Sequence, residues 1–220
     1  MKGFFVRYTW SVVDANAYFI KSGRKGLLVD AVCSGELYER LSEVDELSVI
    51  LTHCHFDHIC GLNRIRELVP ASTMYATELC SENIGNPYRN LSSAANAFLV
   101  FYNHDAEQGD VITPFTCKPA DVVFTDWMDF VWEGHRIRLE SFQGHSKDGL
   151  VCTLDDRYVF TGDTLLPVPT ATRLPGGSTE KFWGEDVPRF ERMGDVWVFP
   201  GHGEPGEIKG MLAGNREAEK

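Results

Sequence analysis

The chain has 220 residues, of which 43% are hydrophobic and 24% charged, and its formal net charge is −11 at pH 7. This length suits one well-buried core, so we predict a single domain over residues 1–220. The acidic balance argues against a nucleic-acid partner, because Lys and Arg form no basic run. No stretch reaches the ~20 apolar residues of a membrane span, and no signal-peptide pattern is present, so we expect a cytoplasmic protein without membrane association.

Short β-type runs separated by turn residues occupy the first thirty positions, a pattern typical of antiparallel strands. The apolar periodicity then predicts a helix over 35–44, a strand over 47–51 and a helix over 62–69, which Pro70 ends. This alternation of strands and helices predicts an α/β fold.

Residues 77–120 differ from the rest of the chain, because they are polar and rich in turn signals, with one possible helix over 92–102. We interpret this segment as an insertion that covers the active site. From position 122 the chain returns to β-type runs, followed by a predicted helix over 179–193 and a last strand over 196–199.

Residues 52–61 read THCHFDHICG and place three histidines and an aspartate within ten positions. At this composition an HxHxDH match arises by chance in roughly one of two thousand such chains. Alternate residues of an extended segment point the same way, so His53 and His55 can hold one ion while Asp57 and His58 turn toward another.

Three later segments share a pattern with this motif: an apolar strand ends at small residues, and a potential metal ligand follows. They are ESF-QG-His145, YVF-TG-Asp163 and WVF-PG-His202. Strand ends converge at one edge of a layered α/β protein, so we expect these side chains to meet His53 and its neighbours.

Three imidazoles with an open position suit Zn²⁺, and a second ion would complete a two-metal clamp ~3.5–4 Å across. We therefore predict two divalent metal ions as cofactors, zinc first, with iron or manganese as alternatives. The predicted ligands are His53, His55 and His145 for the first ion, Asp57, His58 and His202 for the second, and Asp163 shared between them.

The motifs THxHxDHxxG, GHS, TGDTL and PGHG, in this order, resemble the metallo-β-lactamase superfamily over roughly residues 26–207. The resemblance implies a four-layer αββα sandwich with the metals at one edge of two mixed sheets. The segment RLPGGS, which begins at Arg173, is similar to that of the glyoxalase II-like hydrolases. However, GHSKDG replaces the usual GHTPG turn, and we expect no carboxy-terminal glutathione-binding helical domain, which argues against glutathione thioesters as substrates.

These features predict a hydrolase that uses two metal ions to activate water against a small ester, thioester, lactone or amide. Its partner is then a small-molecule substrate. Asp57 is the candidate catalytic residue, because it can orient hydroxide and carry a proton to the leaving group. Arg173 is the candidate for substrate binding.

Other functions of the same motifs stay open. A persulfide dioxygenase-like oxygenase would hold one iron on His53, His145 and Asp163, and iron content with oxygen uptake would distinguish it. A small-phosphodiester hydrolase is a further alternative, which the acidic charge disfavours. A regulator with a structural metal is also disfavoured, because a structural site needs only four ligands.

Several polar residues lack the strand-end pattern and have simpler interpretations. We interpret His104 and His135 as ordinary hydrogen-bonded side chains, with His135 in a hairpin turn. Cys54 should point away from the metals, and Cys60 should be part of the core. We expect free, mostly buried thiols, and a solvated tail over 214–220.

Overall fold

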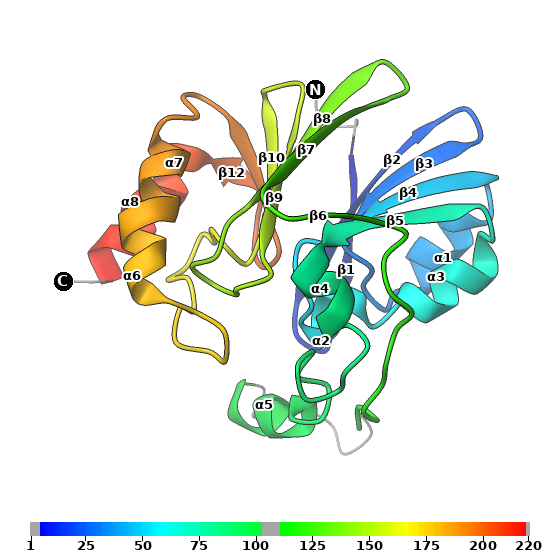
Figure 1. The fold of residues 1–220 in the computed structure, drawn as a ribbon, viewed down its shortest axis with the longest axis horizontal. Coiled ribbons are helices and arrows are strands. Elements are labelled where there is room, and N and C mark those ends of the chain that lie inside the picture. The colour runs from blue at the N-terminus through cyan, green and yellow to red at the C-terminus, as the bar shows by residue number, and fades with distance from the viewer. Residues whose placement is uncertain (1–4, 103–110, 219–220) are drawn as a thin grey trace.

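The computed structural model describes residues 5–102 and 111–218, whose strands form two six-stranded sheets (Figure 1). In the first sheet the strands follow chain order. β1, β2 and β3 are antiparallel neighbours, and the pairs from β3 to β6 are parallel. These strands are β1 (Val6–Trp10), β2 (Ala15–Ser22), β3 (Lys25–Val29), β4 (Glu46–Ile50), β5 (Ser72–Thr77) and β6 (Val122–Phe124).

The second sheet has the order β12-β11-β10-β9-β8-β7 and is antiparallel except for the parallel pair β10 and β11. Its strands are β7 (Trp127–Trp132), β8 (His135–Ser141), β9 (Leu150–Leu154), β10 (Tyr158–Gly162), β11 (Trp197–Pro200) and β12 (Gly206–Glu207).

Helices cover the outer faces of the two sheets, which confirms the predicted four-layer αββα sandwich (Figure 1). On β3 the side chains alternate: Leu27 and Val29 belong to the core between the sheets, and Leu28 belongs to the core under the helices. The first sheet carries α1 (Gly35–Leu41) and α3 (Leu62–Leu68). The second carries α6 (Thr179–Lys181), the π-helical turn η1 (Phe182–Asp186), α7 (Val187–Glu191) and α8 (Ile208–Ala218).

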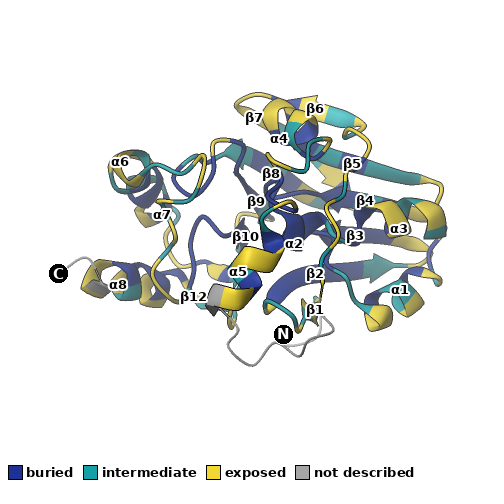
Figure 2. Cartoon of the chain, turned by 90° about the horizontal axis from the view of Figure 1, so that it is seen from below, coloured by how far each residue is buried: buried dark blue, intermediate teal, exposed yellow. Residues whose placement is uncertain are grey.

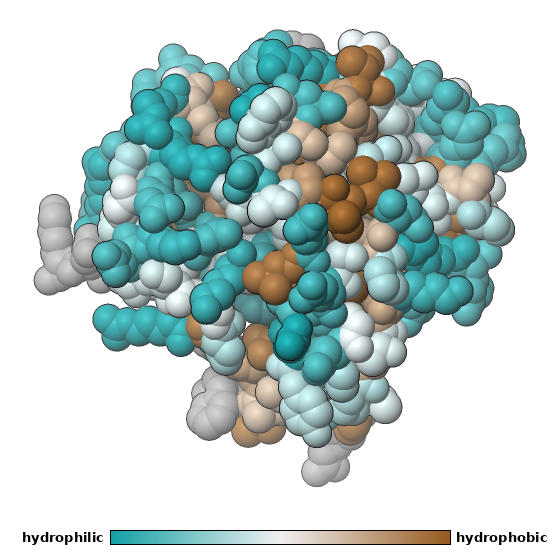
Figure 3. Space-filling model, in the orientation of Figure 1, coloured by the Kyte–Doolittle hydropathy of each residue, from teal (hydrophilic) through white to brown (hydrophobic). Residues whose placement is uncertain are grey.

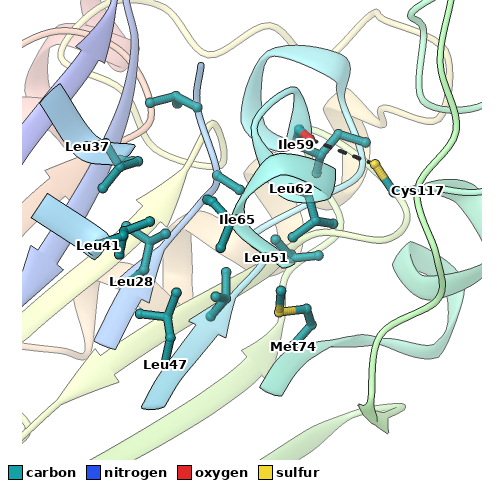
Figure 4. Close-up of a cluster of buried hydrophobic side chains, with 14 of the residues drawn as sticks. Leu28, Leu37, Leu41, Leu47, Leu51, Ile59, Leu62, Ile65, Met74 and Cys117 are labelled. Atoms are coloured by element: carbon teal, nitrogen blue, oxygen red, sulfur yellow. Dashed lines mark hydrogen bonds between the residues drawn. The ribbon is translucent and has the colours of Figure 1, made fainter. Parts of the chain in front are cut away.

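The core under α1 and α3 also fixes the end of the motif segment. Leu37 and Leu41 of α1 lie beside Leu62 of α3 in one buried cluster (Figure 4). Ile59, the last residue of α2 (Phe56–Ile59), joins this cluster, and its carbonyl oxygen accepts a hydrogen bond from Sγ of Cys117 at 3.9 Å. The short helix α2 is therefore anchored at its carboxyl end by apolar packing.

Two expectations about the carboxyl half need correction. The predicted helix over 179–193 is interrupted by the π-helical turn η1. The expectation of a solvated tail over 214–220 is wrong at its start, because α8 continues to Ala218 and buries Asn215. Asn215 donates to the carbonyl of Leu166 and accepts from the N–H of Thr170, so hydrogen bonds compensate its burial.

Among residues 5–102 and 111–218, no helix is long and apolar enough to cross a membrane. Apolar side chains do reach the surface over β6 and the hairpin of β7 and β8 (Figure 3). The exposed apolar residues of these strands are Val123, Trp127 and Val131. They lie at the free edges of the two sheets, where strand pairing ends.

Candidate metal centre

The seven predicted ligands follow four strands whose ends meet between the two sheets. His53, His55, Asp57 and His58 follow β4, the last two within α2. The other three follow β8, β10 and β11, at His145, Asp163 and His202. All but His202 are buried, as the dark-blue centre of Figure 2 shows for the segments near α2. The structure therefore brings all seven together, as the strand-end pattern predicts.

His53, His55 and His145 form one compact group, with a nitrogen of each ring within 4.8 Å of the others. Nδ1 of His55 lies 3.2 Å from Nε2 of His145. Nδ1 of His145 has its partner outside the group, since it lies 2.8 Å from the carbonyl oxygen of Ala171. The Nε2 atom of His145 is thus directed into the group, as a metal ligand would be.

Asp57, His58 and His202 form a second group. Oδ2 of Asp57 lies 3.3 Å from Nε2 of His202 and 3.6 Å from Nε2 of His58. The side chain of His58 is fully buried, whereas that of His202 retains 23% of its exposure. Of the three, His202 is therefore the side chain most open to solvent.

Asp163 lies between the two groups. Its Oδ1 is 3.3 Å from Nε2 of His58, and its Oδ2 is 3.4 Å from Nε2 of His202 and 3.7 Å from Nε2 of His145. It also forms a group with His53 and His58, one residue from each set. A carboxylate in this position can contribute ligand atoms to both groups.

Three buried atoms at the centre of the cluster lack any hydrogen-bond partner: Nε2 of His53, Nε2 of His58 and Oδ1 of Asp163. Leaving buried polar atoms unpaired costs about 1–3 kcal/mol each, and native structures rarely contain them without a reason. All three face one another across the cluster. The donor set of imidazole nitrogens and carboxylate oxygens matches the preferences of Zn²⁺ and related divalent ions, so the residues fit the implied metals.

The two groups have opposite electrostatic character. Burial and the neighbouring imidazoles lower the pKa of His53 well below its usual value, and burial with His145 lowers that of His55 to about 4. Burial also acts to lower the pKa of His202, but Asp163 and Asp57 outweigh it and raise this pKa to about 10. His53 and His55 are thus held neutral, as ligands must be, whereas the second group attracts positive charge.

Asp30 is a site residue that the sequence interpretation missed. Its Oδ2 lies 2.9 Å from Nδ1 of His58 and accepts from Oγ1 of Thr52 at 2.8 Å, and its Oδ1 accepts from the N–H of Thr52. Oγ1 of Thr52 in turn lies 3.0 Å from Nδ1 of His53. A partial signal was present, because the apolar run GLLV ends directly at Asp30, without the small residues that precede the ligands.

Asn16 is a second residue that was missed, and it holds the turn that carries His202. Its Nδ2 donates to the carbonyls of Pro200 and Gly203, at 3.2 and 2.9 Å, and its backbone N–H donates to Gly201 at 2.7 Å. Gly201 is required here, because a Cβ would collide with Oδ1 of Asp163. No sequence pattern marks Asn16, since its partners lie more than 180 residues away.

Asp186, at the end of the π-helical turn η1, holds the turn before His145. Its Oδ2 accepts from the N–H of Gly144 at 2.7 Å, and a Cβ at Gly144 would collide with Asp186 and with Phe182. Burial raises the pKa of Asp186 to about 6, although hydrogen bonds from the backbone of Gly144 and Gln143 act to lower it. π-helical turns are often found at functional sites, and this one fixes the backbone of a predicted ligand.

The remaining candidates have varied outcomes. Arg173 is exposed, on the loop that carries Ala171 to the ring of His145.

Cys54 is buried and its Sγ donates to the carbonyl of Arg89 at 3.4 Å, away from the ligands. Cys60 is only partly buried, so its assignment to the core is wrong. His135 pairs with Asp155 at 2.7 Å in the hairpin, and His104 lies outside the described residues.

The chain leaves the first sheet at Thr77 and returns to it at Val122, and the described part of this excursion packs near the cluster. It contains α4 (Glu78–Asn83) and α5 (Ala95–Tyr102). Leu91 and Ala95 form a buried apolar group with Phe56, the residue directly before Asp57. Figure 2 shows α5 in front of α2 in the view from below.

Comparisons with known proteins agree with this geometry. A model of the metallo-β-lactamase superfamily matches residues 10–202. A probable metallo-hydrolase of Streptococcus pyogenes is 25% identical over 198 residues, which are 87% of this chain and 80% of that protein. The crystal structure of the BLEG-1 B3 metallo-β-lactamase has a TM-score of 0.76 at 22% identity and covers 98% of this chain and 100% of its own. That of TTHA1623 in a di-iron-bound form has a TM-score of 0.71 at 21% identity, with 93% and 95% covered.

The chain therefore belongs to the metallo-β-lactamase superfamily. It is a hydrolase of this superfamily, with a buried cluster of histidines and aspartates that can hold divalent metal ions.

Proposed function

We propose that the protein is a dinuclear metal-dependent hydrolase of a small ester, thioester, lactone or amide, with zinc as the metal. The observation that carries this proposal is the overlap of three potential ligand groups, which share His53 and His58 and leave three buried atoms unpaired. One ion would use His53, His55 and His145, the other Asp57, His58 and His202, and Asp163 would serve both.

When bound, the two ions would lower the pKa of water to about 7 and polarise the carbonyl of the substrate. The residues then have separate tasks. Asp57 is ionised, because His58 and His202 outweigh burial and lower its pKa. Its side chain keeps 12% of its exposure at the open side of the cluster. Asp57 can therefore accept the proton of the attacking water and pass it to the leaving group.

We infer that no protein side chain attacks the substrate. The two nucleophile candidates beside the ligands are both buried: Cys54 is 2% exposed and Ser146 is 4% exposed. The hydroxyl of Ser146 donates to Asp148, and burial raises the pKa of the Cys54 thiol far above neutral pH. Neither group meets an incoming substrate, so water remains as the nucleophile.

We further propose that the single domain carries residues 77–120 as a cover over the site, and that substrate contacts come from this segment and from Arg173. The packing of Leu91 and Ala95 on Phe56 supports the first part. The exposure of Arg173 on the loop that contacts His145 supports the second, because a guanidinium there can reach an acidic group of a substrate. The likeness of RLPGGS to the glyoxalase II-like hydrolases stays a prediction.

Metal analysis of the purified protein, combined with a panel of thioester, lactone, amide and phosphodiester substrates, tests this proposal. We expect close to two zinc ions per chain and hydrolysis of a carbonyl substrate that ends when the metal is removed. One iron per chain, with oxygen uptake on a persulfide, would instead support the oxygenase alternative. Turnover of the phosphodiester alone would support the small-phosphodiester hydrolase.

A further inference from the structure

Two of the six cysteines, Cys33 and Cys60, contact each other next to the second ligand group. The backbone N–H of Cys33 donates to Sγ of Cys60 at 2.9 Å. Both residues keep part of their surface exposed, whereas the other four cysteines are buried. We propose that Cys33 and Cys60 form a reversible intramolecular disulfide that weakens binding of the second metal ion.

The two cysteines lie close enough for this bond to form. A sulfur 2.9 Å from the backbone nitrogen of Cys33 lies within reach of the Sγ of that residue after rotation about χ1. A disulfide needs Cβ atoms about 3.5–4.5 Å apart and an S–S bond of about 2.05 Å. The hydrogen bond from Cys60 also lowers the pKa of Cys33 to about 7, so a substantial fraction of its thiol is ionised at neutral pH.

A hydroperoxide is the class of oxidant that completes the reaction. The sulfur of Cys33 attacks one peroxide oxygen, the O–O bond breaks, and the hydroxide released takes up the thiol proton to form water. Sγ of Cys60 then attacks the sulfenic acid of Cys33, the S–S bond forms, and the S–O bond breaks with loss of a second water. In total the two thiols lose two electrons and two protons, and hydrogen peroxide is reduced to two waters.

Each cysteine lies close in the chain to a residue that belongs to the second ligand group or orients it. Cys60 directly follows α2, which carries Asp57 and His58, and its Sγ donates to the carbonyl of Asp57 at 3.7 Å. Cys33 lies three residues after Asp30, the partner of His58. A new S–S bond must therefore displace one of two segments that together set the direction of the His58 ring.

The two segments cannot absorb this displacement independently, because they are already tied together. Ala31 donates to the carbonyl of His58 at 2.8 Å, and Gly61 donates to the carbonyl of Ala31 at 2.7 Å. A Cβ at Gly61 would lie 2.5 Å from the carbonyl oxygen of Val32, so the backbones touch. A misplacement of about 1 Å at a preorganised site is enough for a large loss of function. This coupling rests on the proposed two-ion site, whereas formation of the disulfide does not.

The first experiment concerns the bond itself. Zinc-loaded protein is treated with a small excess of hydrogen peroxide, the reaction is stopped with catalase, and peptides are mapped by mass spectrometry without reduction. We expect a mass loss of about 2 Da, a linked peptide pair containing Cys33 and Cys60, and full reversal by a phosphine reductant. Oxygen added to either thiol without a link, or a link to another cysteine, would overturn the proposal.

The second experiment concerns the metal, and Cys33→Ala is its matched variant. This change removes one thiol but keeps the backbone N–H that donates to Cys60, and so keeps both hydrogen bonds of Sγ. We expect peroxide to lower the zinc content of the wild type from near two to near one per chain, while Cys33→Ala keeps both ions. Cys33→Ser serves the same purpose if the alanine variant does not fold.

If the disulfide-linked wild type retained both ions, the proposal that the disulfide weakens binding of the second ion would be wrong. An untreated wild type that holds a single ion would contradict the proposed function instead, and the peptide map would still decide whether the disulfide forms.

Discussion

Nδ1 of His58 lies 2.9 Å from Oδ2 of Asp30, and both side chains are buried. The same oxygen accepts from Thr52, whose hydroxyl contacts Nδ1 of His53. One carboxylate thus orients a candidate ligand of each ion. The carboxylate engages Nδ1 of His58 directly and Nδ1 of His53 through Thr52. Nε2 of both rings therefore faces the cluster, where neither atom has a hydrogen-bond partner.

Asp30→Asn should therefore weaken metal binding at both positions. Asp30 has a φ of +62°, which asparagine tolerates as well as aspartate, so the variant should fold. The amide offers one acceptor oxygen where the carboxylate serves Thr52 and His58 with two. We expect zinc affinity to fall by about 10–100-fold in competition with a coloured chelator. An unchanged affinity would contradict the orienting role of Asp30.

Asp57→Asn should separate catalysis from metal storage. The change removes a charge and a proton acceptor but leaves His53, His55 and His145 in place for one ion. The variant should stay folded with at least one ion bound and lose on the order of 10² or more in kcat.

The matched control for this prediction is Asp129→Asn, because Asp129 pairs with Arg138 on the outer hairpin and is no part of the cluster. Its kcat should equal that of the wild type. If folded, metal-loaded Asp57→Asn protein also turned over at the wild-type rate, the hydrolytic mechanism would be wrong.

Asn16→Ala should impair the second ion selectively. The substitution removes both side-chain hydrogen bonds to the turn that carries His202, a residue of the second ligand group and not of the first. We expect zinc titration to show one site of normal affinity and one weakened by about tenfold or more. Asn63→Ala, which removes a single bond to Thr116 on the surface, should leave both sites unchanged. Equal weakening of the two sites would contradict the prediction.

Asp186 should make stability fall as pH rises. Burial raises its pKa to about 6 in the folded protein, above the ordinary value of 3.8, so the folded state holds this proton more tightly than the unfolded state. Between pH 4 and 7 the unfolded carboxyl ionises first, and the wild type should lose on the order of 1–3 kcal/mol relative to Asp186→Asn. Urea unfolding of both proteins across this range measures the difference, which should be constant if the residue does not titrate.

Cys54→Ala and Ser146→Ala should each keep most of the activity, because both side chains are buried beside the ligands and neither is required as a nucleophile. Rapid quenching followed by mass spectrometry should detect no acyl group on the protein. A trapped acyl-enzyme at either position would reject attack by water.

The spacing of residues along a strand predicts the direction of their side chains. This explains why the buried faces of the strands and the orientation of the motif side chains were predicted correctly. The period of two along an extended segment separates Leu27 and Val29 from Leu28 and likewise separates His53 and His55 from Cys54. Helix boundaries near the carboxyl end were less predictable, because the buried carboxylate of Asp186 and the packing of Phe182 favour a π-helical turn within the segment.

The sequence by itself determined the α/β class and the seven residues that converge, because they lie in four segments that each follow an apolar run, and buried strands end at a common edge. Only the tertiary structure decided what surrounds them: Asp30 against His58, Asn16 against the turn of His202, and Cys33 against Cys60. These contacts join positions that are 28, 187 and 27 residues apart in the chain. Local periodicity carries no information about such pairs, since packing of the two sheets and their helices brings them together.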